Sequence, residues 1–203
     1  MSAMKGPTGK QIEFARWLSK LNDPDGHEDR GTLAALRRGL MLEDEQLFEL
    51  YGYIPPRYLS SSYLGDERLY LMVAALYAYH PASFPELDLQ KRRRNLGESL
   101  RLFAEYKRQG EKQGAGDGNE EDLLPDPLKR RMDALLSAPR ADLFGHLRQV
   151  VSLLKTGEVP VDWAQLLYDL QHWESPEREV QWRWSRSFYV GYANQGGDQS
   201  DVR

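Results

Sequence analysis

Arginine is the residue type whose spacing in this sequence points to chemistry, and that chemistry is the binding of phosphate groups. Arg30 and Arg37 are seven residues apart in RGTLAALRRG, so on a helix they lie almost one above the other, with the small Ala34 between them. A guanidinium group keeps its charge and offers five N–H donors, which suits the phosphate backbone of a nucleic acid. The competing interpretation is an ordinary solvated basic face, and the sequence alone favours it for this helix.

Basic residues also cluster at three later places in the chain. The run Lys91–Arg94, KRRR, has the densest positive charge, and a flexible solubilising loop is its alternative interpretation. Lys129–Arg131 forms a second cluster. Helical spacing then places Arg148, Ser152 and Lys155 on one polar face of a later helix. These clusters indicate where a phosphate-binding surface would form.

Residues that often carry catalysis are present, but they form no known constellation. The chain has no cysteine, and its four histidines are dispersed at His27, His80, His146 and His172. None of them has H-E-x-x-H or another close metal-ligand spacing. Ser152–Lys155 matches S-x-x-K, but no second motif of that chemistry accompanies it. We therefore expect no enzyme activity, no metal and no cofactor.

The charge of the chain is unevenly distributed. Residues 111–122 hold one lysine and five acidic residues, which accounts for the whole formal net charge of −4. The remainder is neutral, and a neutral body still carries a basic stripe when its acidic residues lie elsewhere. No apolar run approaches the ~18 residues of a membrane span, and the N-terminus lacks the apolar core of a signal peptide. We expect a cytoplasmic protein without a membrane partner.

The elements that must position the basic residues are helices. Asp142–Trp173 predicts two helices joined by a tight turn, with Gly157 and Pro160 ending the first. Asp162 is the predicted N-cap of the second helix, and Gln165 is placed to complete a capping box. The apolar face of the first helix consists of Leu143, Leu147, Val150, Val151 and Leu154.

Similar signals predict helices along the rest of the chain. Thr8 with Gln11 and Asn95 with Glu98 form candidate capping boxes, and Asp29 is a candidate N-cap. We find no convincing strand, because the alternating patterns are short and interrupted by proline. The predicted fold is all-α, with about nine helices in two small helical bundles.

A glycine-rich acidic segment predicts the division between those bundles. Residues 111–122 contain a single apolar side chain, Ala115, and therefore read as a flexible linker that is mobile and open to proteases. The predicted domains are an N-terminal bundle at 1–110 and a C-terminal bundle at 123–203, whose tail is frayed.

The last helix combines aromatic and basic residues and is predicted to begin at Ser175–Pro176. Its sequence VQWRWSRSFY places Val180, Trp184 and Phe188 on one face, whereas Trp182 lies off that face. A tryptophan on the outer face of a helix is typical of an interface. The predicted protein-interface residues are Trp182, Arg183 and Arg186.

Four motifs in this order resemble the small subunit of the type I-E CRISPR surveillance complex Cascade, which is the CasB family. They are RGTLAALRRG, HLRQVVSLLK, VPVDWAQLLYDL and the basic aromatic VQWRWSRSFY. The resemblance covers most of residues 10–192, apart from the glycine-rich insert. That acidic insert, 111–122, departs from the shorter family pattern.

The resemblance implies a non-catalytic subunit that stabilises the target and displaced DNA strands of the R-loop, while base pairing supplies the sequence specificity. The implied partners are the other Cascade protein subunits, the guide RNA, the target DNA and a second copy of the chain placed head to tail. The arginines that match the basic positions of the family are Arg37, Arg38, Arg130, Arg131 and Arg148. Charge and helical spacing add Arg30, Arg92, Arg93, Arg94, Arg101 and Arg140.

Three other functions fit parts of the sequence. A helical protein–protein adaptor that binds no nucleic acid explains the aromatic residues of the last helix equally well. A helix-turn-helix regulator fits the length of Asp142–Trp173, but the second helix there has hardly any side chains that read bases. A hydrolase requires a site assembled from distant residues, and no motif in the sequence indicates one.

Overall fold

The computed structural model describes residues 6–23, 29–42, 44–59, 64–112 and 124–191. Within these ranges the chain forms ten α-helices and three 3-10 helices, and its one extended pairing is an isolated parallel bridge between Ser83 and Val161. The predicted all-α fold is confirmed. None of the described helices is long and apolar enough to span a membrane.

The helices follow the chain in a simple order. The first half contains α1 (Gly9–Leu21), α2 (Arg30–Arg38), η1 (Gly39–Met41), η2 (Asp44–Tyr53), α3 (Pro56–Leu59), α4 (Leu64–Tyr79), α5 (Glu86–Lys91) and α6 (Leu96–Lys112). The second half contains α7 (Asp126–Ser137), η3 (Arg140–Asp142), α8 (Leu143–Thr156), α9 (Trp163–Gln171) and α10 (Glu179–Tyr189).

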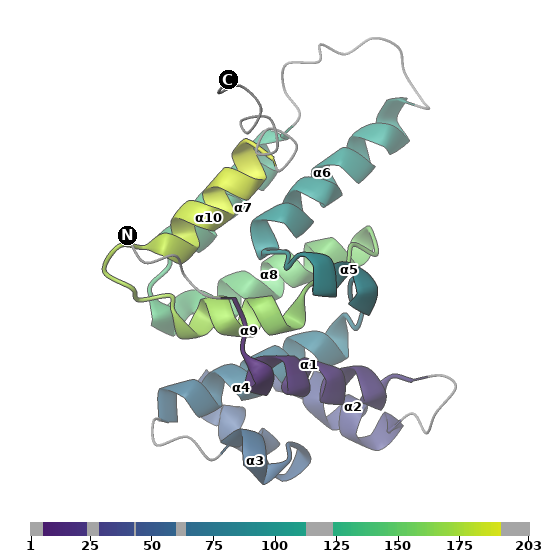
Figure 1. Cartoon of the computed structure of the whole chain (residues 1–203), viewed down its shortest axis with the longest axis vertical. Coiled ribbons are helices and arrows are strands. Elements are labelled where there is room, and N and C mark those ends of the chain that lie inside the picture. Colours follow the sequence, from purple (N-terminus) through teal and green to yellow (C-terminus); the bar gives the residue numbers. More distant parts are fainter. Residues whose placement is uncertain (1–5, 24–28, 43, 60–63, 113–123, 192–203) are drawn as a thin grey trace, which may run out of the picture.

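The helices α8 and α9 lie across the middle of the molecule (Figure 1). On one side, α1 and α4 pack against α9, and α2 packs against α4. On the other side, α6 packs against α10, and both contact α7. The central helix of the first half is α4, in which no residue from 69 to 78 is more than 3% exposed. A helix that is apolar on all sides is expected to be buried in this way.

Local capping explains where several helices begin. The backbone N–H of Thr8 donates to Gln11 Oε1 at 2.9 Å, and Asp29 accepts a hydrogen bond from the backbone N–H of Thr32, also at 2.9 Å. Asn95 and Glu98 bond each other's backbone N–H groups at 3.2 and 3.4 Å. These caps were predicted, because each involves residues only three positions apart.

Two boundary details differ from the sequence prediction. The last helix begins at Glu179 rather than at Ser175–Pro176, because residues before it form a turn in which Arg178 has a φ of +51°. Asp162 caps α9 as predicted, accepting from the Gln165 N–H at 3.0 Å. The Gln165 side chain, however, donates to Asp169 at 2.7 Å and so does not complete the predicted capping box.

Buried residues from both halves of the sequence form one hydrophobic cluster. Tyr77 of α4 meets Trp163 of α9 edge to face, with 5.6 Å between ring centroids. Gln11 of α1 donates to Gln171 of α9 at 2.7 Å.

Of the predicted linker, residues 111 and 112 belong to α6, and 113–122 lie outside the described residues. The division into two bundles stays a prediction. The frayed tail also stays a prediction, because residues 192–203 lie outside the described residues.

Candidate nucleic-acid interface

The arginines of α7 are among the exposed members of the predicted basic set. Arg130 and Arg131 are exposed, because Leu128, Met132 and Leu135 turn the opposite face of the helix into the core. Neither guanidinium makes a hydrogen bond or ion pair with another described residue. Arg38, the last residue of α2, is exposed in the same way. These three side chains keep all their N–H donors available to an anion.

Two further predicted arginines each bond a backbone carbonyl across the fold. Arg37 is exposed, and its Nε donates to the carbonyl of Ala78 at 3.0 Å, near the C-terminal end of α4. Arg148 is half-buried, and its Nη1 donates to the carbonyl of Leu40. Hydrogen bonds of this kind fix the direction of each guanidinium, while the remaining amino groups have no hydrogen-bond partner among the described residues.

The polar face of α8 packs close to the end of α4. Lys155 Nζ lies 3.8 Å from the centroid of the Tyr79 ring, and the Tyr79 hydroxyl is 3.2 Å from Ser152 Oγ. Together with Arg37 and Arg148, Lys155 therefore brings cations from α2 and α8 to one region of the surface. Sequence periodicity placed Arg148, Ser152 and Lys155 on one face, but the neighbour of that face became visible only in the structure.

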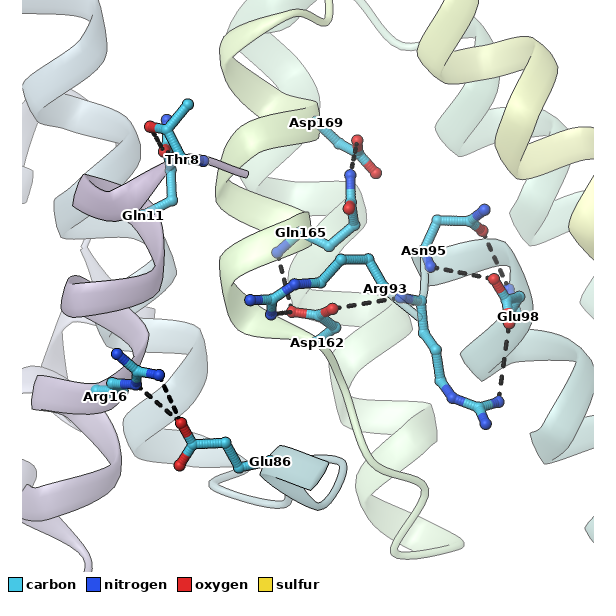
Figure 2. Close-up of polar contacts among 11 residues, drawn as sticks. Thr8, Gln11, Arg16, Glu86, Arg93, Asn95, Glu98, Asp162, Gln165 and Asp169 are labelled. Atoms are coloured by element: carbon cyan, nitrogen blue, oxygen red, sulfur yellow. Dashed lines mark hydrogen bonds and ion pairs between the residues drawn. The ribbon is translucent and has the colours of Figure 1, made fainter. Parts of the chain in front are cut away.

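The KRRR run is tied to two helix starts instead of forming a free loop. Arg92 pairs with Glu98 at 2.7 Å, and Arg93 pairs with the buried Asp162 at 3.3 Å. The backbone N–H of Arg94 also donates to Asp162, at 3.2 Å. Figure 2 shows Asp162 receiving these bonds at the start of α9, while Glu98 faces Asn95 at the start of α6. Two carboxylates, Glu98 and Asp162, thus balance part of the positive charge of this run inside the chain.

Asp162 has an unusual electrostatic environment for a helix cap. Burial raises the pKa of this carboxyl group above its usual value, while the Gln165 N–H and the Arg93 guanidinium oppose the rise. The side chain is fully buried, whereas the side chain of Arg93 remains 25% exposed. The pair therefore joins the 92–94 segment to α9 and leaves part of one guanidinium at the surface.

Arg101 and Arg140 likewise hold neighbouring elements together. Arg101 Nη1 donates to the carbonyl of Phe188 at 3.0 Å, at the C-terminal end of α10, where a cation is favourable. Arg140 Nη2 donates to the carbonyl of Gly65 at 3.2 Å, and its Nη1 pairs with Glu174 at 3.3 Å. Arg30 is exposed at the start of α2.

The predicted interface residues of α10 have two different environments. Trp182 is 73% exposed, and Arg186 is exposed one turn further along the helix. Arg183 Nη2 pairs with Asp169 at 2.6 Å, so its charge is balanced by a carboxylate that is fully buried. Trp184 is fully buried, as its predicted helix face requires. Within the described residues, no three His, Cys, Asp or Glu side chains are close enough to hold a metal ion.

Residues 32–189 match the family model described as CRISPR-associated protein Cse2. The chain belongs to the Cse2 family. A CRISPR-associated protein Cse2 from Thermus thermophilus is 30% identical over 190 residues, which cover 93% of this chain and 95% of that protein. The crystal structure of M. ruber CasB is 25% identical, with a TM-score of 0.66 over 93% of this chain and 97% of that one.

The likeness extends to a solved assembly. A chain in a structure titled CRISPR RNA-guided surveillance complex has the same fold, with a TM-score of 0.66 at 23% identity, over 92% of this chain and 95% of that chain. Two structures from Thermus thermophilus, one titled Cse2 family and one titled CasB, are each 27% identical to this chain, so the resemblance drawn from the sequence motifs is confirmed.

Sequence reasoning missed one residue that organises this Cse2-family chain. Asp169 is fully buried and accepts hydrogen bonds from Gln165 at 2.7 Å, from the Trp184 indole at 2.6 Å and from Arg183 at 2.6 Å. Burial raises the pKa of Asp169, and Arg183 and Trp184 oppose that rise. The signal was an acid four residues after Gln165 inside the apolar run WAQLLYDL, where a charge needs a partner.

Proposed function

We propose that this chain is a non-catalytic subunit of Cascade that binds the target and displaced DNA strands of the R-loop through phosphate contacts. Its membership of the Cse2 family supports a role in CRISPR antiviral defence. The observation that carries the nucleic-acid part is the set of exposed arginines, Arg38, Arg130 and Arg131, whose guanidinium groups bond no other described residue. The guide RNA and the target DNA are the proposed nucleic-acid partners, and the cytoplasm is the proposed location.

The contacts that each arginine makes inside the chain indicate how strongly its guanidinium could bind a phosphate. A guanidinium already paired with a buried carboxylate, such as that of Arg93, gains less from a phosphate because its charge is balanced. Arg37 and Arg148 bond carbonyl groups, so their full positive charge remains and their direction is fixed. We therefore place the principal phosphate contacts at Arg37, Arg38, Arg130, Arg131 and Arg148. The remaining predicted arginines, Arg30, Arg92, Arg93, Arg94, Arg101 and Arg140, have a supporting role.

Phosphate contacts make two properties of the binding measurable. They carry no sequence information, so affinity is expected to be similar for unrelated DNA sequences once base pairing with the guide is equal. They also release counterions, so the affinity falls with salt in proportion to the number of phosphates bound.

Charge reversal in the assembled complex tests the proposal. Arg130→Glu and Arg131→Glu, singly and together, are expected to weaken target DNA binding and to reduce the salt slope by about 0.7–0.9 for each phosphate that is no longer bound. Lys107→Glu is the matched control, because it makes the same charge change at an exposed residue outside the proposed set. If affinity and salt slope stay unchanged in the arginine variants, the chain acts as the protein adaptor instead, a role that the exposed Trp182 favours.

The proposed protein partners are the other Cascade subunits and a second copy of this chain. Exposed apolar side chains occur on α10, where Trp182 is 73% exposed, and on η1 and η2, where Met41 is 87% and Phe48 64% exposed. In Figure 1, α10 lies in the upper half of the molecule, whereas α3, which follows η2 along the chain, lies at the lower end. Arg186 is exposed one turn from Trp182, and Glu49 is exposed beside Phe48, so head-to-tail pairing would bring at least one pair of opposite charges together.

A further inference from the structure

A recess between α1 and α3 combines aromatic and basic side chains. Its volume is about 320 Å³, and its lining consists of Glu13, Arg16, Trp17, Lys20, Arg57 and Tyr58. Three of these side chains are cations and one is a carboxylate, so the recess is positive. None of the six was among the arginines or tryptophans that the sequence singled out for binding.

The aromatic wall of the recess is held rigidly by the core. Phe14 is fully buried and stacks on Trp17, with ring centroids 5.6 Å apart and planes at 28°. Tyr58 is 2% exposed and meets Phe14 edge to face at 5.0 Å and Trp17 at 5.9 Å. Because Phe14 packs on Trp17 from the core, the indole is braced where it lines the recess.

The cations of the recess are arranged around that wall. The Arg57 guanidinium lies 4.7 Å from the centroid of the Tyr58 ring, and its Nη2 donates to the Tyr58 hydroxyl at 3.2 Å. Lys20 is exposed in the last turn of α1, one turn after Arg16. Arg16 is paired with Glu86 at 2.6 Å, as Figure 2 shows, so its charge is already balanced by a carboxylate.

We propose that this recess binds one nucleotide of a single-stranded nucleic acid, with the base against Trp17 and the adjoining phosphate against Lys20 and Arg57. A braced aromatic ring beside cations is the arrangement that single-stranded nucleic-acid sites use, because every base has a π-face and every nucleotide a phosphate. A base inside a duplex is already stacked on both faces, so the site selects unpaired strands. The inference rests on the proposed function and adds a stacking site to the phosphate contacts.

Fluorescence anisotropy with a labelled fifteen-nucleotide oligothymidine tests the site, using the full chain and the assembled complex in parallel. Trp17→Leu removes the ring and is expected to weaken binding about fivefold or more, whereas Trp17→Phe keeps a ring and retains most of the affinity. Lys20→Glu is expected to lower the salt slope by about 0.7. Lys107→Glu is the matched control, since Lys107 is also an exposed lysine on a helix and lies outside the proposed set.

The outcomes separate this inference from the proposed function. If Trp17→Leu and Lys20→Glu bind as the wild type does while Arg130→Glu weakens binding, the recess is not a nucleotide site and the proposed function stands. If neither the chain nor the complex binds the oligonucleotide, both fail. If Trp17→Leu does not fold, the comparison of Lys20→Glu with Lys107→Glu decides alone. A polyglutamate peptide that binds with Lys20-dependent affinity, while the oligonucleotide does not, identifies an acidic protein segment as the occupant and overturns the proposal.

Discussion

Trp182 and Trp184 are two positions apart and have opposite environments. Trp184 is fully buried, packs against Trp173 at 5.1 Å and donates its indole N–H to Asp169 at 2.6 Å. Trp182 is 73% exposed. Helical spacing from Val180 and Phe188 was enough to separate them, because residues two positions apart on a helix lie far round from each other.

We expect Trp184→Ala to lower the free energy of unfolding by about 3–5 kcal/mol, because it leaves a large cavity and removes a donor from a buried carboxylate. Trp182→Ala is expected to change it by less than about 0.5 kcal/mol but to weaken assembly with partner subunits. Thermal melts and a co-purification assay of both variants measure these effects. A larger loss of stability in Trp182→Ala would contradict the assigned helix face.

His80 predicts a loss of stability in mild acid. Its side chain is 4% exposed, and its Nε2 lies 2.7 Å from the carbonyl oxygen of Val159. Burial lowers the pKa of His80 below the usual 6.5, although the bond to Val159 opposes this. As the pH falls, the unfolded chain therefore binds a proton at a higher pH than the folded chain does. The stability that the neutral, buried His80 contributes is fully present above about pH 6.5 and is lost as the pH falls below that value.

Urea unfolding between pH 5 and pH 8 measures this effect. His80→Gln cannot gain a proton but can still reach the Val159 carbonyl, so its stability is expected to depend less on pH than that of the wild type. If the free energy of unfolding falls equally steeply with pH below about pH 6.5 in both proteins, other groups cause the acid sensitivity.

At the scale of elements, the contact between α6 and α10 depends on one glycine. A Cβ atom added at Gly97 would collide with the carbonyl oxygen of Trp184 and lie 2.9 Å from its carbonyl carbon. The backbones of the two helices approach so closely that no side chain fits between them. Sequence periodicity cannot indicate this, because the glycine lies inside an ordinary helical pattern after a capping box.

Gly97→Ala is therefore expected to destabilise the fold by about 1–3 kcal/mol, because the two helices must move apart. Gly145→Ala in α8 is the matched control, since an added Cβ there meets no atom within 4 Å. That change is expected to stabilise the protein by about 0.5–1 kcal/mol through reduced freedom of the unfolded chain. Chemical denaturation of the two variants compares them directly, and a neutral Gly97→Ala would show that the helices separate easily.

At the scale of the whole molecule, the shared hydrophobic cluster predicts one unfolding transition. Residues of α1 and α4 pack against α9 across the predicted boundary, as the Tyr77–Trp163 contact shows. Losing either half would expose the core of the other, so the halves are expected to unfold together. Circular dichroism and tryptophan fluorescence should give the same midpoint in urea.

Two separate transitions would instead support the independent bundles predicted at 1–110 and 123–203. Replacing residues 111–122 with a few glycines and serines adds a second measurement, because this segment contains a single apolar side chain and is expected to contribute little to either half. Loss of cooperativity after that replacement would show that the segment is structural.

The sequence by itself determined the all-α class, most helix starts and the family. Caps such as Asp29 with Thr32 and Asn95 with Glu98 join residues three positions apart, so local spacing reveals them. Apolar periodicity likewise identifies the buried face of each helix, as it did for Trp184. Both signals depend on residues that are close together in the sequence, so they can be recognised without knowledge of the fold.

Only the tertiary structure decided which arginines keep their charge available. Arg93 meets Asp162 from 69 residues away, whereas Arg130 and Arg131 meet no partner among the described residues, yet all three belong to similar basic runs in the sequence. The recess beside Trp17 likewise forms because α3 brings Arg57 and Tyr58 against α1. Periodicity tells which side of a helix is polar, but the neighbour that neutralises or completes that side is set by packing between distant segments.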